Sequence, residues 1–105
     1  MSQEWTMVQI NLAAIYSDRI KGNRQNNLEA ALHHFTAASK IYTKRDFPQN
    51  WATLQNNLGL LYGKLGLHDK QIQSLKASLE VFTRKAFPLD WASTKYNLGL
   101  GYQKL

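Results

Sequence analysis

Few residues in this sequence are of types that carry out chemistry. The chain of 105 residues contains three histidines and no cysteine, which excludes a thiolate zinc site and a thiol nucleophile. His33 and His34 are adjacent, and neighbouring side chains of a helix point about 100° apart, so the two imidazoles cannot bind one ion. His68 and Asp69 are the only other close pair, and a metal site needs several ligands that converge. We expect exposed polar side chains here and no metal site.

Motifs for catalysis are also lacking. The six glycines are dispersed along the chain, whereas a phosphate-binding loop clusters them after a strand. No Ser-His-Asp arrangement and no pair of carboxylates spaced for acid–base work is recognisable. The sequence therefore predicts a protein that is not an enzyme and that needs no cofactor.

An asparagine followed by leucine stands at the same position of three similar segments, which form an internal repeat. The segments WTMVQINLAAIY, WATLQNNLGLLY and WASTKYNLGLGY align without gaps and begin at Trp5, Trp51 and Trp91, so the spacing is 46 and then 40 residues. A Phe-Pro pair precedes the second and the third copy by the same distance, at 47–48 and 87–88. Such self-similarity is the signature of a repeat architecture.

The periodicity inside each unit is helical. In the second copy the apolar residues recur at steps of three and four, which places them on one face of a helix. A second helical stretch follows each of the first two copies, and no segment alternates as a half-buried strand would. We predict an all-helical (all-α) fold with five helices at about 2–20, 26–46, 48–65, 69–86 and 88–105.

Turn and capping residues support these boundaries. Gly22 and Gly66 stand where a left-handed C-terminal cap is expected. Asn26 is followed three residues later by glutamate, as in an N-terminal capping box. Pro48 and Pro88 suit the first turn of a helix. The helices then form antiparallel hairpins in one domain, 1–105, with a first repeat at about 2–46, a second at about 48–86 and a half repeat at 88–105.

Composition and charge narrow the possible partners. The chain is 44% hydrophobic, which is enough apolar surface to exclude an intrinsically disordered protein. Its net charge of +6 is compatible with an anionic partner. The cations are dispersed and the aromatic residues are committed to the repeat, so we expect no nucleic-acid partner. No run of about 18 apolar residues occurs. The first residues lack a signal peptide, and we therefore expect a cytoplasmic protein without a membrane partner.

The repeat resembles the tetratricopeptide repeat. Asn57-Leu58-Gly59-x-x-Tyr62 is similar to the core of that family's first helix, and Ala31, Phe35 and Ala38 match the small, large and small positions of its second. The longer period resembles repeats of the kinesin light chain type. The string Phe-Pro-x-x-Trp-Ala-x-x-x-x-Asn-Leu-Gly is similar to bacterial, especially cyanobacterial, arrays that precede a caspase-like CHAT peptidase domain.

This resemblance implies a short right-handed superhelix that works as a protein-interaction module. Its first helices would line a concave groove for a peptide, with basic residues near its C-terminal part that suit an acidic segment or a C-terminal carboxylate. The residues that the resemblance places in the groove are Asn11, Asn56, Asn57, Leu60, Lys64, Tyr96, Asn97, Leu100 and Lys104. Ile10, Ala14 and Asp18 occupy matching positions in the first copy. An amide both donates and accepts, so the asparagines either grip a peptide backbone or bond to neighbouring helices.

The sequence also indicates which residues pack the helices together and how the ends of the repeat array could be covered. Gly59, Gly99 and Ala13 should let adjacent helices approach closely, and Trp51 and Trp91 should join one repeat to the next. Two and a half repeats lie near the lower limit of about three for independent stability. The chain is therefore either a module with a free groove, a segment that self-associates through its open ends, or an excised fragment of a longer array attached to an effector domain.

Overall fold

The computed structural model describes residues 3–18 and 23–105, and these form five helices. Their bounds are α1 (Gln3–Asp18), α2 (Arg24–Ser39), α3 (Pro48–Lys64), α4 (His68–Ser78) and α5 (Pro88–Gln103). The described ranges contain no β-strand, which confirms the all-helical prediction. No helix within those ranges is long and apolar enough to cross a membrane. The cap expected at Gly22 lies outside the described residues.

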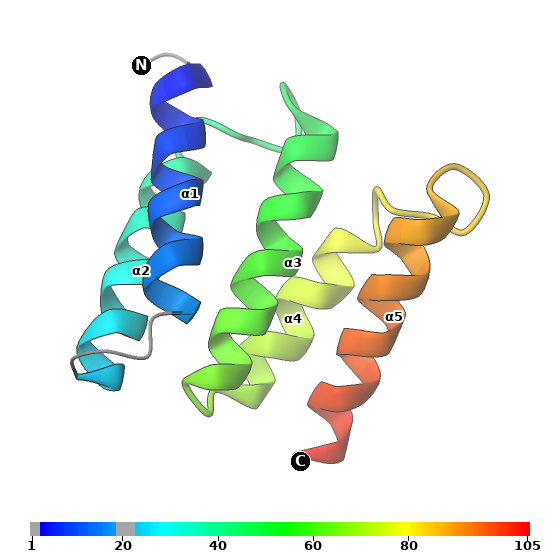
Figure 1. Ribbon diagram of the computed structural model, residues 1–105. Helices are drawn as coiled ribbons and strands as arrows, with labels where there is room; N and C mark the ends of the chain where they lie inside the picture. The colour runs from blue at the N-terminus through cyan, green and yellow to red at the C-terminus, as the bar shows by residue number, and fades with distance from the viewer. Residues whose placement is uncertain (1–2, 19–22) are drawn as a thin grey trace.

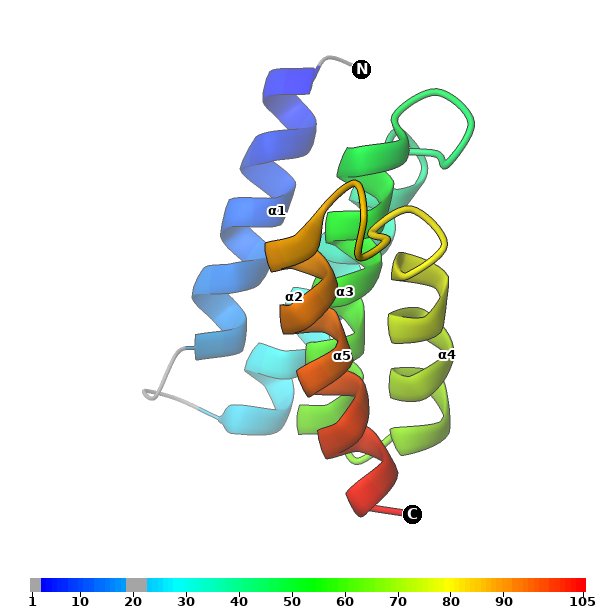
Figure 2. The same cartoon turned by 90° about the vertical axis from the view of Figure 1, so that its right-hand side faces the viewer.

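The helices lie in two layers, as Figure 1 shows. The first helix of each repeat (α1, α3 and α5) stands side by side with the next in one layer, and α2 and α4 lie behind them. α2 packs against both α1 and α3, and α4 packs against both α3 and α5. Figure 2 gives the view from the side, with α5 nearest the viewer and α4 beside it. Each second helix is thus shared by two first helices.

The larger core cluster lies where α2 meets α1 and α3. The small, large, small residues of α2, which are Ala31, Phe35 and Ala38, are all buried there. They meet Leu54, Leu58 and Leu61 of α3, which are 0%, 7% and 1% exposed. A smaller cluster joins α4 to α5 through Ile72, Leu75 and Leu98. Burying a leucine side chain contributes about 1.5–3 kcal/mol, so these two clusters hold the hairpins together.

Close approach between α3 and α4 depends on a glycine. A Cβ at Gly59 would lie 2.7 Å from Leu75 Cδ2, inside van der Waals contact. Ala13, which occupies the same repeat position in α1, is 0% exposed. We expected Gly99 also to let two helices approach closely. This expectation is wrong, because a Cβ at Gly99 would meet nothing within 4 Å. Gly99 lies on a face of α5 that no helix among the described residues covers.

Both second helices end earlier than predicted. α2 ends at Ser39 and α4 at Ser78, whereas the sequence predicted helix to about 46 and 86. In the intervening turn, the Thr43 hydroxyl accepts a hydrogen bond from the Asp46 backbone N–H at 3.3 Å. Phe47 adopts φ −138° and ψ 67° because the following proline disfavours a helical residue before it. The Asp46–Phe47 backbone therefore cannot continue the helix.

The same turn recurs after α4 with nearly the same geometry. Thr83 accepts from the Ala86 N–H at 3.2 Å, and Phe87 has φ −137° and ψ 69°. An aromatic pair closes each turn, with Tyr42 and Phe47 ring centres 5.4 Å apart and the rings of Phe82 and Phe87 at the same separation. The turn is thus part of the repeat and not a frayed helix end.

Cations of these turns lie over the repeat tryptophans. Lys44 Nζ is 5.4 Å from the Trp51 ring centre, and Arg84 Cζ is 5.5 Å from that of Trp91. Lys44 also pairs with Glu80 at 3.1 Å, between two exposed side chains. The predicted helix bounds place these cations in the last turns of α2 and α4, facing the helix dipoles. This placement is wrong, because both helices end before them.

Other helix ends agree with the sequence only in part. Pro48 and Pro88 occupy the first helical positions of α3 and α5, as predicted. Gly66 has φ +77°, which confirms the left-handed cap. The cap of α2 is Asn23 and not Asn26, because the Asn23 side chain accepts from the Asn26 N–H at 3.0 Å.

The two repeat-equivalent glycines should respond oppositely to alanine. Gly59→Ala forces its Cβ against Leu75 and should lower the free energy of unfolding by about 1–3 kcal/mol. Gly99→Ala should raise it by up to about 1 kcal/mol, because alanine favours the helix and nothing obstructs it. Urea denaturation followed by circular dichroism measures both. Equal effects of the two substitutions would contradict the difference in packing.

Candidate functional site

The candidate site is the face that α1, α3 and α5 share on the side away from α2 and α4. The residues expected in a groove come from these three helices, and Lys104 follows directly after α5. The side chains of Ala14 and Asp18 lie outside the described part of the chain. The remaining expected residues are Ile10, Asn11, Asn56, Asn57, Leu60, Lys64, Tyr96, Asn97, Leu100 and Lys104, of which none is buried.

Large apolar side chains remain exposed on this face. Leu60 and Leu100 hold the same repeat position in α3 and α5 and are 39% and 42% exposed. Tyr96 is 60% exposed, and Met7 of α1 is 57% exposed. Leu54, Leu58 and Leu61 of α3 and Leu98 of α5, which belong to the two core clusters, are under 10% exposed. On α3, the fold therefore buries the apolar residues that face α2 and α4 and leaves the third face accessible.

One pair of amides joins α3 to α5 across this face. Asn97 Nδ2 donates to Asn56 Oδ1 at 3.3 Å, and both side chains are half-buried. The bond runs between different repeat positions, since Asn97 is the equivalent of Asn57. The same bond from Asn57 toward α1 would need an acceptor at Ile10, which has none. The repeat-equivalent residues Asn57 and Asn97 therefore differ, because only Asn97 bonds to a neighbouring first helix.

Asn11 and Asn57 keep their amides available. Within residues 3–18 and 23–105, the structure gives neither side chain a hydrogen bond. Asn11 is exposed and Asn57 is half-buried. Each amide can donate two hydrogen bonds and accept others. Both can thus bond to a ligand without breaking a bond that holds the fold.

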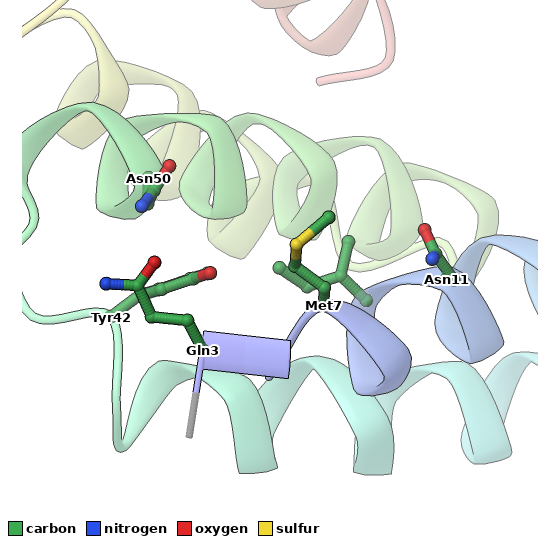
Figure 3. A pocket seen from close by; sticks show the side chains of 6 residues that line it. Gln3, Met7, Asn11, Tyr42 and Asn50 are labelled. Atoms are coloured by element: carbon green, nitrogen blue, oxygen red, sulfur yellow. The ribbon is translucent and has the colours of Figure 1, made fainter. Parts of the chain in front are cut away.

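A pocket of about 320 Å³ opens between α1 and α3 (Figure 3). Its wall combines three amides with apolar side chains and one tyrosine. Met7 points between the two helices, and Asn50 lies across from Gln3. The lining residues are Gln3, Met7, Ile10, Asn11, Tyr42 and Asn50. Among the residues that the structure describes, no carboxylate, imidazole or amine lines the pocket, so it suits an uncharged group that can form hydrogen bonds.

Several pocket residues were not foreseen from the sequence. Gln3, Met7 and Asn50 extend the expected groove by a turn toward the start of α1 and α3. Met7 was recognisable, because it lies one helical turn before Ile10 and Asn11. Tyr42, which belongs to the larger core cluster, was not among the residues expected in the groove. It is 5% exposed, yet it reaches the pocket from the turn after α2.

Two histidines are more enclosed than expected. His34 Nδ1 lies 2.5 Å from Gln9 Oε1, and His68 Nδ1 lies 2.9 Å from Gln71 Oε1. Both side chains are half-buried, so the expectation of exposed residues is wrong for them, and only His33 is exposed. Across the described ranges, no three His, Asp or Glu side chains are grouped as metal ligands would be.

Comparison of the chain with protein-family models, with curated proteins and with solved structures gives no match.

The two classes of asparagine should separate in stability measurements. Asn97→Ala removes the bond to Asn56 and should lower the free energy of unfolding by about 0.5–1.5 kcal/mol. Asn57→Ala should change it by no more than about 0.5 kcal/mol. Urea titrations of both variants, with Asn56→Ala and the Asn56→Ala/Asn97→Ala double variant, measure the coupling. A cost at Asn57 equal to that at Asn97 would contradict the assignment.

Proposed function

We propose that this chain is a protein-interaction module of the tetratricopeptide type, without catalytic activity. The arrangement of the helices supports this proposal, since each second helix packs between two first helices, as in stacked helical hairpins. Gly59, against Leu75, and the buried Ala31, Phe35 and Ala38 occupy the positions at which the sequence resembles that family. The proposed superhelix would present α1, α3 and α5 along its concave side.

One observation carries the proposed binding function. Met7, Leu60, Tyr96 and Leu100 stay exposed on the single face that all three first helices share. Exposed apolar side chains gathered on one face are typical of binding surfaces. Asn11 and Asn57 lie among them with amides that the described structure does not use.

The chemistry of this face favours a peptide in extended conformation. Amides at repeated positions can bond to successive peptide groups whatever the side chains of the ligand. The pocket beside Met7 can receive one uncharged side chain. Lys64 and Lys104, both exposed, favour an acidic residue or a carboxylate terminus toward the α5 end. The same face would serve a module that works alone or one within a longer array attached to an effector domain.

A displayed library of random peptides, each about one dozen residues long, tests this function. Peptides selected on the wild-type chain should bind Leu60→Asp at least about tenfold more weakly, since the new carboxylate is buried under the ligand. Gln73→Asp, on the exposed side of α4, introduces the same charge elsewhere and should leave binding unchanged. Fluorescence anisotropy with the selected peptides measures both. Equal binding to wild type and Leu60→Asp would place the ligand on another surface.

Self-association is a second candidate function, because the outer face of α1 is also apolar. Val8 and Ile15 are 50% and 62% exposed, whereas their equivalents Leu54 and Leu61 in α3 are 0% and 1% exposed against α2. A second copy that covered this face would bury both side chains.

Light scattering across a concentration series tests the second candidate. Self-association through α1 predicts a mass that rises with concentration in the wild type and stays near 12.1 kDa in Ile15→Lys. A mass near 12.1 kDa for the wild type throughout would leave α1 without this role.

A further inference from the structure

A tyrosine hydroxyl reaches the pocket between α1 and α3 from the turn after α2. Tyr42 is 5% exposed, and its ring belongs to the larger core cluster. Within residues 3–18 and 23–105 its hydroxyl forms no hydrogen bond, although the oxygen is not sealed from solvent. Figure 3 shows that this hydroxyl points into the pocket, toward Met7. A nearly enclosed polar group that keeps its bonding capacity is a place where a ligand can bond.

The second repeat shows that the fold does not need this hydroxyl. Tyr42 and Phe82 hold the same repeat position, since each precedes the phenylalanine of a Phe-Pro pair by five residues. Both side chains are buried, and each ring centre lies 5.4 Å from that of the following phenylalanine. Phenylalanine therefore fills the position as tyrosine does. The Tyr42 hydroxyl adds nothing to this packing and is available to the pocket that it faces.

Three amides around the same pocket also keep their bonding capacity. Gln3, Asn11 and Asn50 line it, and the described part of the chain gives none of these side chains a hydrogen bond. Each amide can donate two hydrogen bonds and accept others at its oxygen. With the tyrosine hydroxyl, the lining therefore offers both donors and acceptors, and none of its described members carries a charge.

This set of groups disfavours most side chains as occupants. An aliphatic side chain would displace water from the amides and the hydroxyl without bonding to them, which weakens a complex. A carboxylate or an ammonium group would lose water without meeting an opposite charge. A serine or threonine hydroxyl has only one hydrogen to donate. A primary amide donates two bonds and accepts at its oxygen, so it can bond to an amide of the wall and to the tyrosine hydroxyl together.

The apolar part of the lining distinguishes glutamine from asparagine. Met7 and Ile10 complete the wall on the side of α1. The two methylene groups of a glutamine side chain can cover these apolar groups, whereas asparagine has only one methylene. The volume of about 320 Å³ also admits the longer side chain together with an adjoining peptide group. Glutamine is therefore the residue that matches both parts of the wall.

We propose that the pocket between α1 and α3 selects a glutamine side chain of the bound peptide. This inference rests on the proposed function, because the glutamine belongs to a peptide that lies along α1, α3 and α5. The Tyr42 hydroxyl and the amides of the wall bond to the glutamine carboxamide, and Met7 covers its methylene groups. The pocket thus determines one residue of the ligand.

A single glutamine with both ends capped tests the pocket without a longer peptide. We would titrate N-acetylglutamine methylamide into the 105-residue chain with isotope-labelled methionine methyl groups, because Met7 lines the pocket. The Met7 methyl resonance should shift and saturate with a Kd on the order of 1 mM. The capped glutamate and leucine derivatives should bind at least about fivefold more weakly. Equal binding of the three derivatives, or no saturation by the glutamine derivative at about ten times this Kd, would overturn the proposal.

One substitution separates the hydroxyl from the ring that carries it. Tyr42→Phe installs the residue of the second repeat, so its unfolding in urea should match that of the wild type. It should weaken the glutamine derivative at least about fivefold, and the leucine derivative not at all, because only a hydrogen bond is lost. Tyr62→Phe removes a hydroxyl of α3 from outside the described lining and should change neither affinity. Undiminished binding of the glutamine derivative to Tyr42→Phe, or an equal loss in both variants, would contradict the assignment.

Failure of this inference and failure of the proposed function give different results. Leu60 is not among the described residues that line the pocket, so Leu60→Asp should bind the glutamine derivative as the wild type does. Peptides selected from the random library should share a glutamine, and its replacement by glutamate should weaken them about tenfold. Selected peptides that lose affinity for Leu60→Asp but share no glutamine would overturn the inference alone. Peptides that bind Leu60→Asp unchanged, beside a capped glutamine that still occupies the pocket, would overturn the proposed function and not the preference of the pocket.

Discussion

Close packing of each first helix on its second helix is the interaction on which the rest of this structure depends. Gly59 provides the clearest case, because even one methyl group there would collide with Leu75. Ala13, Ala52 and Ser78 are each 0% exposed, and the Ser78 hydroxyl donates to the Ala52 carbonyl at 2.8 Å between the two layers. Short contacts let dispersion forces act over many atom pairs at once. Small residues at a few positions thus decide how the large ones interlock.

This packing gives a first helix such as α3 two faces that contact second helices and one face that stays open. One side of α3 meets α4, another meets α2, and the remainder is open together with α1 and α5. Leu54, Leu58 and Leu61 are buried in the core, whereas Leu60 is 39% exposed on the open face. The basic residues are divided as well. Lys44, Lys70, Lys76 and Arg84 each lie over an aromatic ring at 5.4–5.8 Å, so four of the 13 Lys and Arg residues contact aromatic side chains of the fold.

The sequence predicted the features that local chemistry determines. Five helices, the prolines that begin α3 and α5, and the Gly66 cap all follow from periodicity and backbone preference. The ends of α2 and α4 did not follow, because the periodicity of Tyr42 and Phe82 matches a helix although both residues lie in turns. For the candidate site, the repeat register indicated which residues share a face. A bond from an asparagine to a neighbouring helix was one of the two expected roles, but that Asn97 alone of the three forms it, with Asn56, could not be foreseen. The pocket and the exposure of Gly99 could not be foreseen either, because each depends on which segments meet in space.

The turn that recurs at 40–47 and 79–87 also has a consequence for how such a chain changes in length. Phe47 and Phe87 have backbone angles within 2° of each other, and the hydrogen bonds around them match. A recombination event between these two turns would duplicate or delete 40 residues and leave a join that the protein already contains. No new loop would have to be selected, and the reading frame would be kept. Gene duplication can therefore lengthen this architecture by one hairpin at a time, and no step needs a partial repeat.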